Sequence, residues 1–248
     1  MSRWNAAGIH LSISVVIGLA VLALLFWVWY PAPYFKVSGG LELTMILLGV
    51  DLVLGPLMTL VVFKAGKKSL GFDLSVIAAL QLCALLYGLH VIVAARPVFI
   101  VGAIDRFNVV AANEIDPADL AKGTRPEFST LSWTGPRVVA ARLPSDTSLR
   151  SALMFATAAG GADIERLPVN YVAYDDEKPH LLARAKPLED LREKSAAASD
   201  AVDAWLRERA RAEAEVVWLP IKARRASLTM LLDARTGDLL GAIDVNPW

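Results

Sequence analysis

Three long stretches with almost no charged residues constrain this chain more than any other feature. Residues 43–63, a run of 21, hold one charged side chain, that of Asp51. Residues 4–35 contain no Asp, Glu, Lys or Arg, and residues 74–95 form a third uncharged run. About 20 apolar residues in a helix span the hydrocarbon core of a bilayer. We therefore predict three transmembrane helices, at about 11–29, 43–63 and 74–95, with membrane lipid around them.

The first apolar run resembles a signal peptide only in part. It begins after Arg3, as a signal peptide does, but it is too long and it has no small-residue cleavage site. It ends in the aromatic sequence FWVWYPAPYF, whose rings favour the interface between membrane and water. We therefore expect it to be retained as a membrane anchor.

The charges are distributed unevenly, although the chain as a whole has 25 basic and 25 acidic residues. Residues 1–96 carry six Lys or Arg and three Asp or Glu, whereas residues 97–248 carry 19 and 22. The second part has the size and composition of one soluble domain. No basic excess indicates a nucleic-acid partner. Because Cys83 is the only cysteine, an intrachain disulfide is excluded.

The orientation in the membrane follows from Lys and Arg near the ends of the spans. Arg3 and the three lysines within residues 64–68 lie on one side, whereas Lys36 and Arg96 lie on the other. This distribution predicts that the N-terminus and the lysine-rich loop are cytoplasmic. Three spans then place residues 97–248 on the outer side of the membrane.

Asp51 is the costly residue inside the membrane, by about 2.5–3.5 kcal/mol on insertion scales. Gly55 and Pro56 follow it, and they loosen the helix and allow a neighbouring helix to come close. Gln81 lies at a similar depth in the third span and is the favoured polar neighbour. The other polar candidates in the spans are His10, Ser12, Ser14, Tyr87 and His90.

Three roles remain open for Asp51. It could bond to Gln81 or another span and specify packing, since polar pairs between membrane helices are common. It could instead face the transmembrane helix, or the terminal amine, of a partner protein. Conduction of protons or ions is the third role, although three spans alone do not enclose a pathway.

The soluble part reads as an α+β domain with an antiparallel sheet. Strands are expected at 98–104, 107–112, 137–143, 216–223, 227–233 and 238–245, and helices at 147–159, 179–185 and 187–215. Between the last two strands, Gly237 stands where a bulged hairpin needs a positive φ. The acidic run at 175–177 is expected to be a solvated loop.

The soluble part contains no recognisable catalytic or metal-binding motif. The sequences HExxH, CxxC, GxSxG and GxGxxG are absent. We therefore expect no catalytic residues, no metal and no cofactor. The alternative is a membrane-anchored enzyme that uses His180, Asp105 or the acids at 175–177. A periplasmic sensor is a third hypothesis, but the 64–68 loop leaves little room for a cytoplasmic output.

Three segments resemble the type IV pilin accessory protein family (the TfpX/TfpZ type). They are RWNAAGIHLSISVVIGLAVLALLFWVWYPAPYF, GVDLVLGPLMTLVVFKAGKKSLGFDL and ARPVFIVGAIDRFNVVAANEI, and the resemblance covers about residues 3–116. Positions on the family pattern are Arg3, His10, Trp29-Tyr30-Pro31, Asp51, Gly55-Pro56, Lys64, Asp73, Arg96-Pro97 and Asp105-Arg106.

The resemblance implies a non-enzymatic protein of the bacterial inner membrane, with a periplasmic domain at 97–248. It also implies that the major pilin of type IV pili is the partner and that the protein assists its stability or assembly. Under the alternative hypothesis, the membrane-anchored enzyme would modify pilin or envelope polymers. We expect Asp51, Gly55, Pro56 and Gln81 to contact the pilin in the membrane. In the soluble domain, the candidate contact is Asp105-Arg106.

Overall fold

The computed structural model describes residues 2–248 and divides into two compact units. The helical unit comprises the chain up to Phe35 together with Gly39–Ala95. The sheet unit comprises Lys36–Ser38 and Arg96–Trp248. The predicted fold class, three candidate membrane helices and a domain of helices and a sheet, is confirmed.

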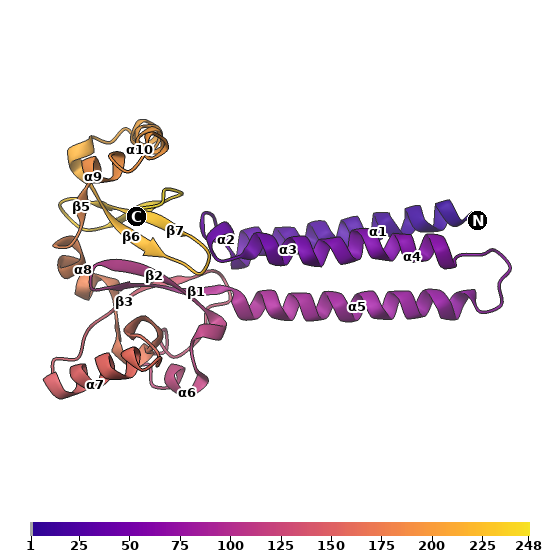
Figure 1. Ribbon diagram of the computed structural model, residues 1–248, viewed down its shortest axis with the longest axis horizontal. Coiled ribbons are helices and arrows are strands. Elements are labelled where there is room, and N and C mark those ends of the chain that lie inside the picture. Colours follow the sequence, from indigo (N-terminus) through magenta and orange to yellow (C-terminus); the bar gives the residue numbers. More distant parts are fainter. Residues whose placement is uncertain (1) are drawn as a thin grey trace. The chain divides into compact units, whose positions relative to one another are not determined.

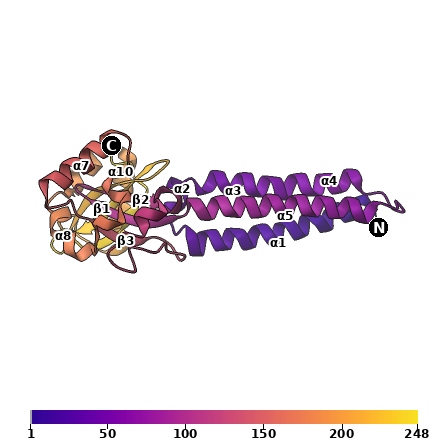
Figure 2. The same cartoon turned by 90° about the horizontal axis from the view of Figure 1, so that it is seen from below.

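Three rods of helix run side by side in the helical unit (Figures 1 and 2). The rods are α1 (Arg3–Leu24) with the π-helical turn Leu25–Trp29, then α3 (Gly40–Gly49), the π-helical turn Val50–Leu54 and α4 (Gly55–Val62), and last α5 (Leu70–Ala95). The short helix α2 (Tyr34–Val37) follows the first rod. All three rods are long and apolar enough to cross a membrane.

The core of the helical unit is small. Tyr30 is fully buried, and its hydroxyl donates a hydrogen bond to the carbonyl of Ile92 at 2.9 Å. Only 22%, 22% and 11% of the three apolar windows are buried within the protein. The apolar surface that remains is far larger than soluble proteins expose, so lipid or a partner must cover it.

The sheet unit is built on one mixed sheet with the strand order β4-β3-β1-β2-β6-β7-β8, and β5 pairs with β6. Its strands are β1 (Pro97–Ala103), β2 (Arg106–Ala111), β3 (Arg137–Ala141), β4 (Tyr171–Val172), β5 (Lys186–Pro187), β6 (Val216–Lys222), β7 (Ser227–Asp233) and β8 (Leu239–Ile243). Five pairings are antiparallel, as predicted. Two non-local pairings, β1 with β3 and β2 with β6, are parallel.

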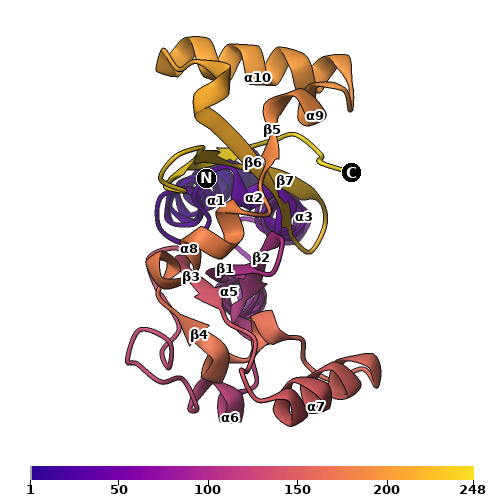
Figure 3. The same cartoon turned by 90° about the vertical axis from the view of Figure 1, so that its left-hand side faces the viewer.

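Two separate clusters of helices pack against this sheet, and Figures 1 and 3 show α7 and α10 at opposite ends of the unit. The helices are α6 (Pro117–Leu120), α7 (Thr147–Ala158), α8 (Tyr174–Leu182), α9 (Leu188–Arg192) and α10 (Ala196–Arg209). The apolar sides of α9 and α10 share a core with β6 and β7. In α7, by contrast, no residue is buried.

Two sequence predictions for the sheet unit are wrong. The single helix expected at 187–215 is divided into α9 and α10, because Ser195 has extended backbone and its hydroxyl accepts a hydrogen bond from the N–H of Ala198. This is an N-cap, which starts a new helix. The acids at 175–177 are not a loop but the first turn of α8, where carboxylates favour the positive end of the helix dipole.

Candidate partner-binding site

Asp51 lies in a π-helical turn, and the sequence explains why the turn forms there. A proline inside an α-helix removes one N–H donor and clashes with the carbonyl four residues earlier. Inserting a wider π-turn before Pro56 relieves that clash. In the π pattern, the carbonyl of Asp51 would accept from residue 56, which has no N–H. The backbone oxygen of Asp51 is therefore available to another donor.

Gln81 supplies that donor from α5. Its Nε2 donates to the carbonyl oxygen of Asp51 across a long hydrogen bond of 3.4 Å. Gly55 makes the approach possible, because a Cβ atom at this position would overlap the Gln81 amide. At Gly49, a Cβ atom would meet nothing within 4 Å. The structure thus brings together Asp51, Gly55 and Gln81, but through the backbone of Asp51 rather than its carboxyl group.

Asp51 lines two hollows between the helices. Asp51 is 8% exposed, and among residues 2–248 no donor forms a hydrogen bond with its carboxyl oxygens. One hollow, of about 170 Å³, holds polar groups of His10, Ser14 and Gln81. His10 lines the same hollow as Asp51, and its Nδ1 lies 2.6 Å from Oγ1 of Thr59.

The second hollow is an apolar groove of about 350 Å³ between the second and third helical rods. We call it the span groove; it is lined by Leu43, Ile46, Leu47, Val50, Asp51, Ala84, Tyr87, Gly88 and Val91. Asp51 is its only charged residue. A groove of this kind suits an apolar helix that carries one cationic or hydrogen-bond-donating group opposite the carboxylate.

The other polar candidates in the spans have different roles. The hydroxyl of Ser12 donates to the carbonyl of Gly8 in its own helix at 3.0 Å. Tyr87 lines the span groove and is 72% exposed. Ser14 is buried and lines the hollow of about 170 Å³. Of these candidates, His10 and Ser14 share that hollow with Asp51 and Gln81, whereas Tyr87 shares the span groove with Asp51.

In the sheet unit, Asp105 and Arg106 form a closed pair at the turn between β1 and β2. Arg106 donates from Nε and Nη2 to the two carboxyl oxygens of Asp105, at 2.8 and 3.2 Å. These hydrogen bonds lower the pKa of Asp105 and raise the pKa of Arg106. The guanidinium of Arg106 also lies 5.3 Å from the ring centroid of Trp248. Each side chain of the pair therefore neutralises most of the charge of the other.

The residues considered for an enzyme also have polar partners within the sheet unit. Nδ1 of His180 lies 3.0 Å from Glu177, which also binds Arg142 at 2.7 Å. Asp175 pairs with Lys178 at 2.7 Å. Within residues 2–248, no group of three or more His, Cys, Asp or Glu could hold a metal ion.

Comparison with known proteins identifies the family. The family described as fimbrial assembly protein FimB matches residues 1–39. A fimbrial assembly protein of Dichelobacter nodosus, serogroup E1, is 31% identical over 97% of this chain and 94% of its own length. The chain belongs to the fimbrial assembly protein family. A second member from D. nodosus, serogroup I, is 34% identical over 73% of this chain and 71% of its own length.

The fimbrial assembly proteins confirm the resemblance to type IV pilin accessory proteins at the level of the family. Their names describe assembly rather than an enzymatic reaction. No solved structure matches the chain. The assignment of the family therefore rests on sequence, and the geometry of the two units comes from this structure.

The sequence did not predict the span groove. It also did not predict a groove in the sheet unit beside the turn between β1 and β2, which is described below. The span groove depends on how the second and third rods are rotated about their axes, which a uniformly apolar sequence does not specify. One local signal was available for the sheet unit. Ile104-Asp105 joins two strands directly, without the glycine or asparagine that such tight turns normally use.

Proposed function

We propose that this member of the fimbrial assembly family binds the major pilin of type IV pili in the bacterial inner membrane and assists its stability or assembly. The observation that carries the proposal is the similarity over 97% of the chain to a protein named for fimbrial assembly. A pilin awaiting assembly is itself an apolar helix with a globular head. A partner for such a subunit needs both a membrane surface and a soluble domain.

The span groove supports a specific way of holding the subunit. Its apolar walls accept an apolar helix by close packing, which drives association of helices in lipid. The Asp51 carboxylate then provides one strong acceptor for a donor or an amine on that helix. Gly55, Pro56 and Gln81 act through Asp51, because they set the π-turn and hold its backbone. Asp105-Arg106 is the proposed contact in the soluble domain.

The first test of this proposal is photo-crosslinking from the span groove. A crosslinking amino acid at Ile46, which lines the groove, is expected to capture pilin in intact cells. Met45 is the matched control, because it lies one residue away and is similarly exposed, at 66% against 68% for Ile46. Immunoblotting for pilin reads the result. Capture of only lipid or a second copy at Ile46, or equal capture from both sites, contradicts the proposal.

The proposed orientation has its own prediction. A fluorescent protein that matures only in the cytoplasm is expected to stay dark when fused after Trp248, whereas alkaline phosphatase at the same site is expected to be active. The physical reason is the lysine-rich loop, which the positive-inside bias holds in the cytoplasm. The same fluorescent protein inserted after Lys68 serves as the control and is expected to fluoresce. Fluorescence from the Trp248 fusion would contradict both the orientation and this mode of pilin binding.

A further inference from the structure

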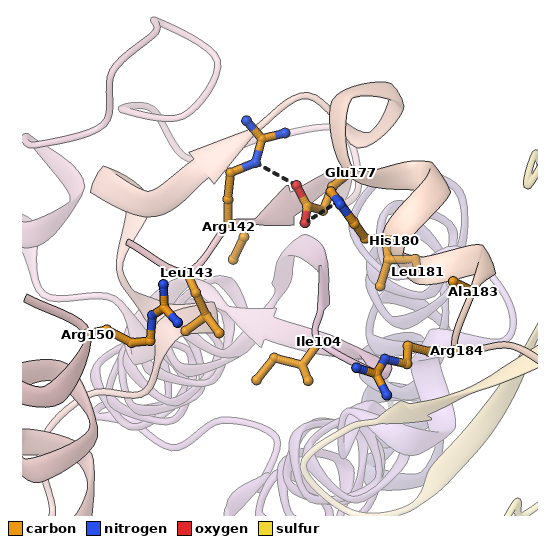
Figure 4. A pocket seen from close by; sticks show the side chains of 10 residues that line it. Ile104, Arg142, Leu143, Arg150, Glu177, His180, Leu181, Ala183 and Arg184 are labelled. Carbon is orange, nitrogen blue, oxygen red and sulfur yellow. Dashed lines mark hydrogen bonds and ion pairs between the residues drawn. The ribbon is translucent and has the colours of Figure 1, made fainter. Parts of the chain in front are cut away.

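A groove of about 480 Å³ in the sheet unit gathers arginine side chains around an apolar floor. We call it the arginine groove; its principal residues are Ile104, Arg142, Leu143, Arg150, Glu177 and Arg184. They come from the β1–β2 turn, the segment after β3, α7, α8 and the segment that follows α8. In Figure 4, Arg150 and Arg184 lie on opposite sides, with Leu143 and Ile104 between them.

The three arginines differ in how their charges are compensated. Arg142 donates to the Glu177 carboxylate and to the carbonyl of Asp176, both at 2.7 Å. Arg150 donates to the carbonyls of Pro144 and Ser145, at 3.1 and 3.4 Å, which fixes its position but supplies no negative charge. The Arg184 guanidinium has no hydrogen bond or ion pair with the described part of the chain. Two positive charges therefore remain open to a ligand.

Ile104, on the floor, is held in a strained conformation. The N–H of Asp105 donates to the carbonyl of Ala103 at 2.8 Å, so that Ile104 is the central residue of a γ-turn. Its φ of +60° belongs to the rare, strained form of this turn, which a β-branched residue adopts at a cost. Ile104 is nevertheless 57% exposed. Strain at an exposed apolar side chain points to a role in binding rather than in the core.

We propose that the arginine groove binds an acidic segment of a polypeptide. An apolar side chain of the segment would lie on Ile104 and Leu143, and flanking carboxylates would pair with Arg150 and Arg184. Planar guanidinium groups match carboxylates through two parallel hydrogen bonds. The apolar floor favours a polypeptide over a free anion, which has no apolar part. This site is separate from the span groove and does not require the proposed function there.

The test uses the full chain in detergent and a fluorescent peptide with a central leucine and two glutamates on each side. Fluorescence anisotropy at low ionic strength is expected to detect binding by the native protein. The double variant R150A/R184A is expected to bind at least about tenfold more weakly, because two charge-assisted contacts are lost. The variant R207A/R235A removes the same charge from two exposed arginines elsewhere in the sheet unit and is expected to bind normally.

A second variant separates binding from folding. Ile104→Gly removes the exposed side chain and places at the turn the residue that tolerates a positive φ. The melting temperature is expected to stay the same or rise, while peptide affinity falls about fivefold. A merely structural role for Ile104 would not lower the affinity of a protein that remains fully folded.

Three results would overturn the inference. One is equal binding of a peptide in which glutamine replaces every glutamate. Another is equal loss of affinity in R150A/R184A and R207A/R235A. The third is binding of vesicles containing anionic phospholipid that depends on Arg150 and Arg184 while the peptide does not bind, which would assign the groove to a lipid surface instead.

Discussion

Substitution of Asp51 by leucine is expected to keep the chain in the membrane and to abolish assembly of fimbriae. Loss of the carboxylate favours insertion into the membrane but weakens the proposed binding of pilin. An aspartate near the middle of a span opposes insertion by about 2.5–3.5 kcal/mol, whereas leucine favours it. If the carboxylate binds a donor on pilin, its loss removes a charge-assisted hydrogen bond of about 1.5–3 kcal/mol. That free energy corresponds to about 10- to 150-fold in affinity.

Two measurements together decide the outcome for Asp51→Leu. Membrane fractionation gives the amount of inserted protein, and electron microscopy gives the number of fimbriae per cell. Asp51→Asn is the matched control for charge, because the amide keeps the size and still accepts a hydrogen bond. We expect it to retain part of the function. Normal fimbriation by Asp51→Leu would show that the residue serves packing alone, whereas loss of the protein from the membrane would show that it is needed for folding.

The three candidate membrane spans were predictable because their signal depends on composition and length. The uncharged runs and the charges that close them correspond closely to Arg3–Trp29, Gly40–Val62 and Leu70–Ala95. The depth of a residue along a span follows from its number, so the contact between Asp51 and Gln81 was also expected. We did not expect the backbone carbonyl of Asp51 to be the acceptor, because the sequence does not show that a π-turn before Pro56 frees this carbonyl.

The sheet unit shows where local patterns stop being informative. The spacing of three and four continues from Leu188 and Leu191 to Val202 and Trp205, because α9 and α10 bury the same side against one core. The break at Ser195 does not interrupt that pattern, and one long helix was therefore predicted. The parallel pairing of β1 with β3, like that of β2 with β6, joins strands far apart in the chain. Hydrophobic alternation gives a strand's faces but not its neighbours.

The arginine groove could not have been predicted for the same reason. Ile104, Arg150 and Arg184 are far apart in the sequence, and each is an ordinary surface residue when it is considered alone. Only the packing of α7 and α8 beside the β1–β2 turn brings them to one place. By contrast, Asp105-Arg106 was singled out because it falls on the family pattern, and the two side chains pair with each other.

Trp218→Ala is expected to have the largest effect on the stability of the sheet unit. Trp218 is 1% exposed, lies on β6 in the core beneath α9 and α10, and donates from Nε1 to the carbonyl of Pro187 at 2.9 Å. The substitution leaves a cavity and removes the hydrogen bond to Pro187. Replacing a buried tryptophan with alanine lowers the free energy of unfolding by about 3–5 kcal/mol. Because β5 pairs with β6 at this residue, the connection into α9 is weakened as well.

Denaturant unfolding of the full chain in detergent, followed by circular dichroism, measures this loss. Trp133→Ala is the matched control, because it deletes the same side chain at a site that is 61% exposed. Its ring lies 4.3 Å from the guanidinium of the buried Arg96, a contact of about 2 kcal/mol. Trp218→Phe should fall between the two, since it refills most of the cavity but cannot donate to Pro187. Equal losses at Trp218 and Trp133 would mean that the core under α9 and α10 is not packed as the structure has it.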